Sequence, residues 1–341
     1  MPQPMVSVIV VNWNGKAYLG ECLNSLRNQT FLDFELIVVD NGSTDGSFEF
    51  VQSHFPEFGH ILRNPENMGF ARGNNQGIRA ARGKYIALLN NDAQADKDWL
   101  EELLRAAEGD HRIGMLASKI YLQGSSKVID NVGHLIYRDG LNRGRGRLEV
   151  DHGQFGEKEE VFFPSGCAAF YRQEMLEEIG LFDEDFFAYG DDTDIGLKGR
   201  LAGWKCLYVP SAIVYHRYSQ SSGTYSPLKA FYVERNRFWI AVKYFPASML
   251  LKSPFYTLWR FLLQGYGALA GRGAAGKFTQ EYSAFHLLGI LAQAYISGIQ
   301  GLPKMWKKRK EIKKLTRVRK KEILSWFKRF GISAREISLK E

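Results

Sequence analysis

Short continuous runs of Val, Ile and Leu alternate with helix-like segments through the first third of the chain. The apolar runs cover residues 6–12, 34–40, 60–64 and 85–92, and the amphipathic segments cover 17–29, a stretch from about 46, 73–83 and 99–109. Strands that are apolar on both faces and separated by helices are typical of a parallel sheet covered on both sides. The pattern predicts an α/β fold with a mostly parallel, Rossmann-like sheet.

Polar residues follow three of these apolar runs at the point where each run ends. They are residues 12–15, 40–43 and 90–92. The carboxyl ends of parallel strands meet at one edge of a sheet, and open α/β sheets bind their ligands there. The sequence Asn90-Asn91-Asp92 by itself fits either a turn or an ion site, because Asn and Asp also favour the bends that end a strand.

From about residue 115 to 226 the pattern is less regular, and it contains a dense acidic cluster. Asp191, Asp192 and Asp194 stand at the start of a predicted helix, where the helix dipole favours negative charge. Three carboxylates in four residues also repel one another unless a cation or a proton-transfer role compensates. A predicted strand follows and leads to His216, which fits either a metal ligand or a packed surface residue.

The last third of the chain is aromatic-rich and then strongly basic. Residues 227–303 predict amphipathic helices, since none of their segments offers the roughly 20 uninterrupted apolar residues of a spanning helix. The tail 304–341 places its apolar residues near one face of a basic helix: Ile312, Leu315, Ile323, Trp326, Phe327 and Phe330. Such a helix fits the surface of an anionic membrane, and the alternative is a charged helix packed on the protein.

The net charge of +8 over 341 residues comes from this tail rather than from the whole surface. Residues 304–329 hold thirteen Lys or Arg against two Glu, so the rest of the chain carries a net charge of −3. A slightly acidic body argues against a broad nucleic-acid-binding face, and no nucleic-acid partner is expected.

Cysteine usage and the start of the chain bear on the compartment. Cys22, Cys167 and Cys206 form no C-x-x-C pair, which argues against a disulfide framework and a zinc site. Cys167 fits a small buried residue better than a nucleophile. The first residues show no secretory signal pattern, so we expect a cytoplasmic protein, peripheral on the inner face of the cell membrane.

Two common nucleotide-binding motifs are absent from the sequence. No G-x-G-x-x-G follows the first predicted strand, and no G-x-x-x-x-G-K-[ST] occurs. A dehydrogenase and a P-loop enzyme therefore lose most of their support.

Four motifs together carry a family resemblance: VVDNGSTDGS, NPENMGFARGNNQGI, LLNNDA, and FFAYGDDTDIGLKGRLAGW followed by YHRYSQSSG. In this combination residues 5–240 resemble the family 2 glycosyltransferases with the GT-A fold, in particular the bacterial rhamnosyltransferase-like branch that builds surface polysaccharides. The resemblance implies inverting transfer of a sugar from a nucleotide diphosphate donor, dTDP-rhamnose or a UDP-sugar, to a hydroxyl of a lipid-linked glycan. The predicted domains are a catalytic domain over 1–226, the helical region 227–303 and the tail 304–341.

The resemblance also assigns chemical roles to acidic residues and one histidine. Asp92 stands at the last position of the family's D-x-D motif and is expected to bind Mg²⁺ or Mn²⁺ with His216, while Asn90 in place of the first aspartate lowers the charge of the site. Asp192 is expected to act as the base for the acceptor hydroxyl. Asp191 is expected to orient the acceptor or its partner, with a structural helix cap as the alternative.

The expected donor-binding residues are Asn12, Asp40, Asn41, Gly69, Arg72, Asn75 and Asn91. Among them, Asp40 matches the family carboxylate that hydrogen-bonds the donor's pyrimidine or ribose, and its alternative is a turn residue. Gly69, Arg72 and Asn75 match the family's loop and helix start, where glycine permits close approach of the backbone and a helix N-terminus suits an anion.

Two other classes of protein remain as alternatives. A sugar nucleotidyltransferase would share the fold and the metal carboxylates, but normally has a Gly-rich loop with Arg or Lys where this chain has NWNGKAYLG. An inactive binding protein with the same fold would be expected to lack the metal or base carboxylate, and both Asp92 and Asp192 are present. The segment ERNRFW only loosely matches Q-x-x-R-W, so a processive synthase is not expected. Oligomerisation is left open.

Overall fold

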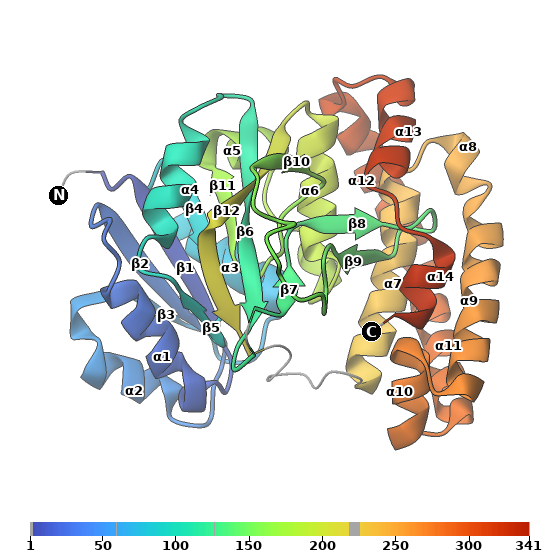
Figure 1. Cartoon of the computed structure of the whole chain (residues 1–341), viewed down its shortest axis with the longest axis horizontal. Helices are drawn as coiled ribbons and strands as arrows, with labels where there is room; N and C mark the ends of the chain where they lie inside the picture. Colours follow the sequence, from blue (N-terminus) through green and yellow to red (C-terminus); the bar gives the residue numbers. More distant parts are fainter. Residues whose placement is uncertain (1–2, 59, 126, 218–225, 341) are drawn as a thin grey trace. The chain divides into compact units, whose positions relative to one another are not determined.

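A computed structural model describes residues 3–58, 60–125, 127–217 and 226–340, and the chain divides into two compact units (Figure 1). The first unit comprises Met1–Gly133, Gly144–Gly199 and Trp204–Ser221. The second unit comprises His134–Arg143, Arg200–Gly203 and Ser222–Glu341.

The strands are β1 (Val6–Asn12), β2 (Phe34–Asp40), β3 (His60–Arg63), β4 (Tyr85–Leu88), β5 (Ala93–Ala95), β6 (Ile113–Leu122), β7 (Ile129–Asn131), β8 (His134–Ile136), β9 (Asn142–Gly144), β10 (Glu159–Val161), β11 (Ala169–Arg172) and β12 (Lys205–His216). The helices up to β12 are α1 (Lys16–Arg27), α2 (Ser47–His54), α3 (Phe70–Ala80), α4 (Trp99–Ala107), α5 (Gln173–Ile179) and α6 (Asp191–Leu201), with 3₁₀ turns η1 (Pro56–Phe58) and η2 (Glu184–Phe186). The later helices are α7 (Pro227–Tyr244), α8 (Ala247–Leu250), α9 (Ser253–Ala270), α10 (Gly273–Glu281), α11 (Ala284–Gln300), α12 (Leu302–Leu315), α13 (Lys320–Arg329) and α14 (Ala334–Leu339).

The main sheet of the first unit has the strand order β10-β12-β6-β11-β4-β1-β2-β3. The four strands from the first third of the chain, β3, β2, β1 and β4, are parallel neighbours, as the apolar runs predict. Strand β11 lies between β4 and β6 and is antiparallel to both. No local pattern in its four residues predicts this insertion, because a strand's direction depends on which neighbours it pairs with.

Alternating side chains of β1 support the two covering layers of this sheet. Val6, Val8 and Val10 belong to one buried cluster together with α1 and α4. Ile9 and Val11 face α3, where a Cβ atom on Gly77 would lie only 2.5 Å from the Ile9 Cγ2 atom. The glycines of α3 therefore let this helix pack close to the strand, which keeps the sheet's carboxyl edge in a fixed position.

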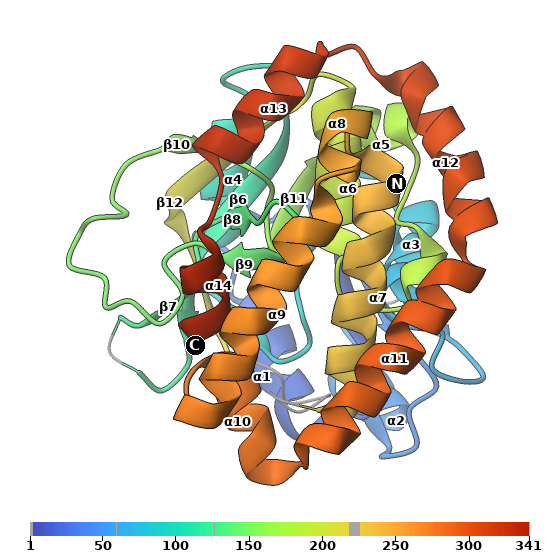
Figure 2. The same ribbon diagram turned by 90° about the vertical axis from the view of Figure 1, so that its right-hand side faces the viewer.

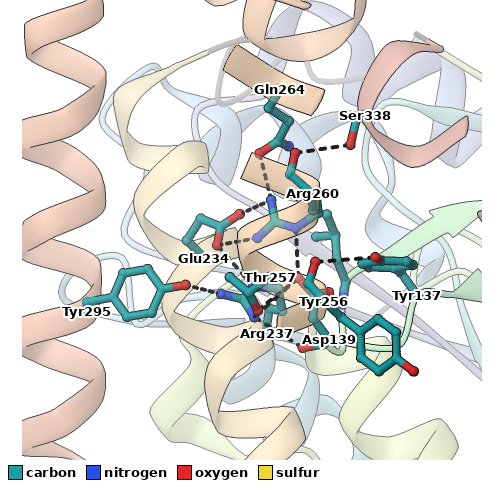
Figure 3. A network of polar contacts seen from close by, with 11 residues as sticks. Tyr137, Asp139, Glu234, Arg237, Tyr256, Thr257, Arg260, Gln264, Tyr295 and Ser338 are labelled. Atoms are coloured by element: carbon teal, nitrogen blue, oxygen red, sulfur yellow. Dashed lines mark hydrogen bonds and ion pairs between the residues drawn. The ribbon is translucent and has the colours of Figure 1, made fainter. Parts of the chain in front are cut away.

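Helices α7, α9 and α11 of the second unit enclose a network of buried charges (Figure 3). The guanidinium of Arg260 binds both carboxylate oxygens of Glu234 at 2.8 and 2.9 Å, and Asp139 Oδ2 at 2.7 Å. Arg237 Nε donates to the same glutamate at 3.0 Å. Burial raises the pKa of Asp139 and Glu234, but the two arginines outweigh it and hold both below their usual values.

The described part of the basic tail contains most of α12 and then α13 and α14, so the single helix predicted over its apolar residues is wrong. Helix α12 ends at Leu315, and α13 begins only at Lys320. The apolar side chains Trp326, Phe327 and Phe330 are buried, with the Phe327 ring 5.0 Å from that of Phe245 in α7's C-terminal cap. Much of the tail's apolar face packs on the protein, which is the alternative considered for this segment.

Among the described residues, no single helix is both long enough and apolar enough to cross a membrane. One pair, α11 and α12, meets the criterion jointly with a bend of 57° between its helices.

Replacement of Arg260 by Met should strongly destabilise the second unit. The variant leaves Glu234 and Asp139 buried with Arg237 as their remaining arginine, and breaking one member out of a buried ion network typically costs about 3–5 kcal/mol. Urea unfolding at neutral pH measures this change. Arg272→Met is the matched control, since that arginine is exposed and its loss should stay within about 0.5 kcal/mol. Equal stability of the two variants would contradict a structural role for the network.

Candidate active site

The polar residues at the strand ends meet at the carboxyl edge of the sheet. The parallel register of β1 and β2 places Asn12 beside Asp40. Asn12 Oδ1 accepts a hydrogen bond from Asn91 Nδ2 at 2.8 Å, and its carbonyl accepts one from the Asn41 N–H at 2.7 Å. Three segments that are distant in the sequence are therefore joined through Asn12, which is itself 1% exposed.

Asp40 presents a buried carboxylate with one unused acceptor. Its Oδ2 accepts a hydrogen bond from the Ser43 N–H at 3.3 Å and lies 4.0 Å from Arg63 Nε. Its Oδ1 is buried and has no hydrogen-bond partner among the described residues. A buried acceptor without a donor is costly, so this oxygen suits a ligand that brings an N–H or O–H group.

Asp92 and His216 come together because β5 pairs with the end of β12. The antiparallel register sets Ala93 opposite His216, and the Arg217 N–H donates to the Asp92 carbonyl at 3.0 Å. The Asp92 Oδ1 atom then lies 3.2 Å from His216 Nε2, with both residues buried. The two residues expected as metal ligands, 124 positions apart in the sequence, are thus neighbours in the structure.

A third residue, Asp130 of β7, completes this cluster, and the sequence analysis did not predict its place there. Its Oδ2 lies 2.7 Å from His216 Nδ1, and its Oδ1 accepts a hydrogen bond from Arg147 at 2.6 Å. Burial by itself lowers the pKa of His216, but contacts with Cys167, Asp130 and Asp92 hold the pKa well above its usual value. The only signal in the sequence was an acidic residue after two β-branched ones, in VIDN.

Cys167 supports the same cluster from the loop before β11. Its carbonyl accepts a hydrogen bond from the Asn90 N–H at 2.8 Å, and its thiol is in contact with His216. The residue is 6% exposed, and burial raises the pKa of the thiol. The prediction of a small buried residue rather than a nucleophile is in keeping with this environment.

Asp92 and His216 are the pair that could hold a divalent cation. A carboxylate oxygen and an imidazole nitrogen converge here, and Asp130 fixes the ring from its other nitrogen, as outer partners of metal-binding histidines do. No group of three or more His, Cys, Asp or Glu that could hold a metal ion occurs among the described residues. One carboxylate and one imidazole fit a cation that takes its remaining ligands from a substrate and water, as Mg²⁺ and Mn²⁺ do with phosphates.

The acidic pair at the start of α6 has two different environments. Asp191 is 5% exposed, and burial and the neighbouring charge of Asp192 raise its pKa well above the usual value. A Cβ atom on Gly166, which precedes Cys167 in the supporting loop, would lie 3.9 Å from Asp191 Oδ2. Asp192 is half-buried, and its Oδ1 accepts a hydrogen bond from the Thr193 N–H at 2.7 Å. Asp192 is therefore the member of the pair that a substrate can reach more readily.

Asn41 and Asn75, both expected to bind the donor, use their amide groups inside the protein. Asn41 holds the loop before α3 through hydrogen bonds with Asn64, Asn67, Met68 and Gly69. Asn75 donates to the Phe182 carbonyl and to Glu184 Oε1, both at 2.9 Å, and accepts from the Phe182 N–H at 3.0 Å. Both residues position loops of the site, and a direct role toward the donor is not supported by these contacts.

Two N–H groups at the start of α3, where an anion site is expected, are used within the protein. The N–H groups of Phe70 and Ala71 donate to the Phe187 carbonyl at 2.7 and 3.4 Å. Gly69 has a positive φ of 84°, and a Cβ atom there would lie 2.6 Å from the same carbonyl oxygen. The glycine thus serves a close approach between two protein segments. Arg72 is half-exposed and lies 3.8 Å from Glu184.

Comparison with known proteins identifies the family to which the chain belongs. The sequence profile of the family described as Glycosyl transferase family 2 matches residues 7–180. EpsH of Bacillus subtilis, named as a candidate glycosyltransferase, is 31% identical over 140 residues, which are 41% of this chain and 41% of EpsH. TuaG of the same organism, named as a candidate glycosyltransferase of teichuronic acid biosynthesis, is 28% identical over 197 residues, 55% of this chain and 76% of TuaG. The match thus spans less than two thirds of EpsH.

Among solved structures, the mannosyltransferase PcManGT from Pyrobaculum calidifontis in complex with GDP-Man and Mn²⁺ is similar, with a TM-score of 0.51. The sequence identity is 16%, and the match covers 90% of this chain and 89% of that one. A likeness at this identity establishes the fold alone, and it confirms the predicted GT-A fold with its C-terminal helical extension.

Replacement of Asp130 by Asn should weaken Mn²⁺ binding. The variant removes the charged acceptor that orients His216, and losses of such outer partners typically cost about 10–100-fold in metal affinity. Titration of Mn²⁺ in the presence of UDP, followed by the electron paramagnetic resonance of free Mn²⁺, gives the affinity. Asp110→Asn, the same substitution at an exposed ion pair with Arg112, should leave it unchanged. An unaltered affinity in a folded Asp130→Asn protein would rule out this role.

Proposed function

Because the chain belongs to glycosyltransferase family 2, we propose that it transfers a sugar from a nucleotide diphosphate donor to a hydroxyl of a glycan, with inversion at the anomeric carbon. The observation that carries this proposal is the meeting of Asp92 and His216 at the carboxyl edge of the sheet, next to Asn91 and its bond to Asn12. A carboxylate and an imidazole at this edge suit the diphosphate of a donor and its cation.

The buried edge of the sheet provides the donor site in this proposal. The unused Oδ1 atom of Asp40 accepts a hydrogen bond from the pyrimidine or ribose, and none of the residues that the structure describes donates a hydrogen bond to it. Asn91 donates a hydrogen bond to Asn12, and this pair links the strand end that carries Asp40 to the turn that carries Asp92. The donor is dTDP-rhamnose or a UDP-sugar.

Asp92 and His216 hold Mg²⁺ or Mn²⁺ in this proposal, and the cation when bound stabilises the negative charge of the departing diphosphate. The Mn²⁺ in the complex of the structurally similar PcManGT supports the choice of ion. Asp130 keeps the His216 ring in place from the other side.

Asp192 takes the proton of the acceptor hydroxyl as that oxygen attacks the anomeric carbon from the face opposite the diphosphate. The new bond joins the acceptor oxygen to the anomeric carbon, while the bond from this carbon to the phosphate oxygen breaks and its electron pair leaves with the diphosphate. Asp191, more deeply buried beside Gly166, orients the acceptor or its partner. A carboxylate in this role contributes about 10²–10⁴ in rate.

The acceptor in this proposal is a lipid-linked glycan of surface-polysaccharide assembly, met at the cytoplasmic face of the cell membrane. The name of TuaG, which refers to teichuronic acid biosynthesis, supports a polysaccharide product. The resemblance to the rhamnosyltransferase-like branch supports dTDP-rhamnose as the donor, with a UDP-sugar as the alternative.

Product analysis tests the proposal against its alternatives. With Mn²⁺ and a panel of nucleotide sugars, a transferase should release a nucleoside diphosphate, whereas a sugar nucleotidyltransferase would exchange pyrophosphate. An inactive binding protein would release neither product, although a bound nucleotide sugar would still raise the unfolding temperature by mass action. Pyrophosphate exchange, or binding without turnover across the panel and with lipid-linked acceptors, would overturn the proposal.

Asp192→Asn should separate the chemical step from donor binding. The variant keeps the size of the side chain but removes the proton acceptor, so kcat for transfer should fall by about 10²–10⁴ while the donor dissociation constant changes little. Asp191→Asn is the matched control and should have a milder defect. Near-normal transfer by Asp192→Asn with an inactive Asp191→Asn would reverse the two assignments, and loss of donor binding in both would place the pair in the nucleotide site.

A further inference from the structure

Helix α9 of the second unit turns an apolar stripe outward along most of its length. The exposed residues are Phe255, Leu258, Trp259, Leu262, Tyr266 and Leu269, the last of them 92% exposed. At 3.6 residues per turn these six positions fall within an arc of about 100°. An exposed apolar patch of this extent marks an interaction surface.

The opposite side of α9 is polar and faces the interior of the unit (Figure 3). Arg260 is fully buried in its ion pairs with Glu234 and Asp139, and Thr257 and Gln264 lie one turn before and after it. This arrangement is the reverse of a helix on the surface of a protein in water, whose apolar side faces the core. Polar groups inside and apolar groups outside are typical of helices in contact with lipid.

Helix α11 extends the same kind of surface. Its exposed residues include Phe285, Leu288, Ile296 and Ile299, with Phe285 86% exposed. The rings of Phe261 in α9 and Tyr295 in α11 are 6.3 Å apart, so the two helices approach one another at this point. Figure 2 shows α9 and α11, both in orange, on the side of the second unit that faces the viewer.

The charges around this apolar surface are almost all positive. Residues 247–310 contain nine Lys or Arg and a single acidic residue, Glu281, and all of the nine except the buried Arg260 and Arg309 are at least partly exposed. Lys252 and Arg272 are exposed next to the two ends of α9, and exposed lysines of α12 follow α11 in the chain. Basic side chains at the margins of an apolar helix face match the phosphates of anionic phospholipids.

We propose that the outer faces of α9 and α11 insert into the headgroup boundary of an anionic phospholipid bilayer. The stripe runs along most of α9 rather than at one end, so the helix lies in the plane of the membrane. The basic residues that flank the stripe contact lipid phosphates. This assignment differs from anchoring by the tail, because Trp326, Phe327 and Phe330 are buried, and it does not depend on the proposed sugar transfer.

The same charges argue against a second copy of this chain as the occupant. Two copies that cover the patch on each other would bring their basic margins together, with Glu281 and the exposed Glu336 of α14 as acidic residues to balance them. Like charges at an interface oppose association, whereas anionic lipids complement them.

Flotation of the full chain with vesicles of phosphatidylglycerol and phosphatidylcholine tests the insertion. We expect the protein to float with the vesicles and to remain bound in 1 M NaCl, where exposed charges are largely screened. The triple variant Leu258→Ser, Leu262→Ser, Leu269→Ser should lose at least tenfold in bound fraction at high salt. Leu32→Ser is the matched control, since Leu32 is 78% exposed in the first unit.

Two further readouts keep the outcome decisive. Brominated acyl chains should quench the fluorescence of the wild type more than that of Trp259→Phe, whereas Trp13→Phe, also exposed but in the first unit, should retain the quenching. Equal flotation of the triple variant and the wild type, with the unfolding temperature preserved, would overturn the proposal. If the wild-type protein does not bind vesicles and is oligomeric, while the triple variant is monomeric, the patch is instead an interface between copies.

Discussion

The site depends on the contact between His216 and the carboxylates of Asp92 and Asp130. The imidazole is buried and lies 3.2 Å from one carboxylate and 2.7 Å from the other. Such a group is stable in the interior only because each nitrogen has an acidic partner, and Arg147 in turn neutralises the second acid. The three elements that supply these residues, the turn after β4, the short strand β7 and the end of β12, must therefore keep their register for the cluster to exist.

The sheet edge brings further polar groups to this cluster at low conformational cost. Parallel pairing of β1 and β2 fixes Asn12 beside Asp40, and the hydrogen bond from Asn91 to Asn12 joins them to the turn that carries Asp92. Asn41 and Asn75 use their amides to hold the loops around the edge. The buried asparagines at this edge therefore form a rigid frame, while Asp40 retains an unused acceptor.

Buried charge has a different consequence in the second unit. Two arginines and two acids form a neutral network among α7, α9 and the segment before β9, and this network draws the polar side of α9 inward. The apolar side of the helix then has no place in the protein interior and faces outward. The buried polar side chains and the exposed apolar stripe thus both follow from the orientation of α9. A bilayer would complement the exposed apolar stripe.

The sequence by itself determined the parallel strands and the sheet edge at which their polar ends meet, because strand periodicity is a local property of the chain. It did not determine that β11 pairs antiparallel between β4 and β6, or that Asp130 is a partner of His216. It also did not determine that the Phe187 carbonyl accepts hydrogen bonds at the start of α3. It also predicted an apolar face on the tail helix whose aromatic residues the fold buries. Each of these features depends on a hydrogen bond or packing contact between segments far apart in the chain, and only the tertiary structure decides which of several chemically equivalent partners lies within reach.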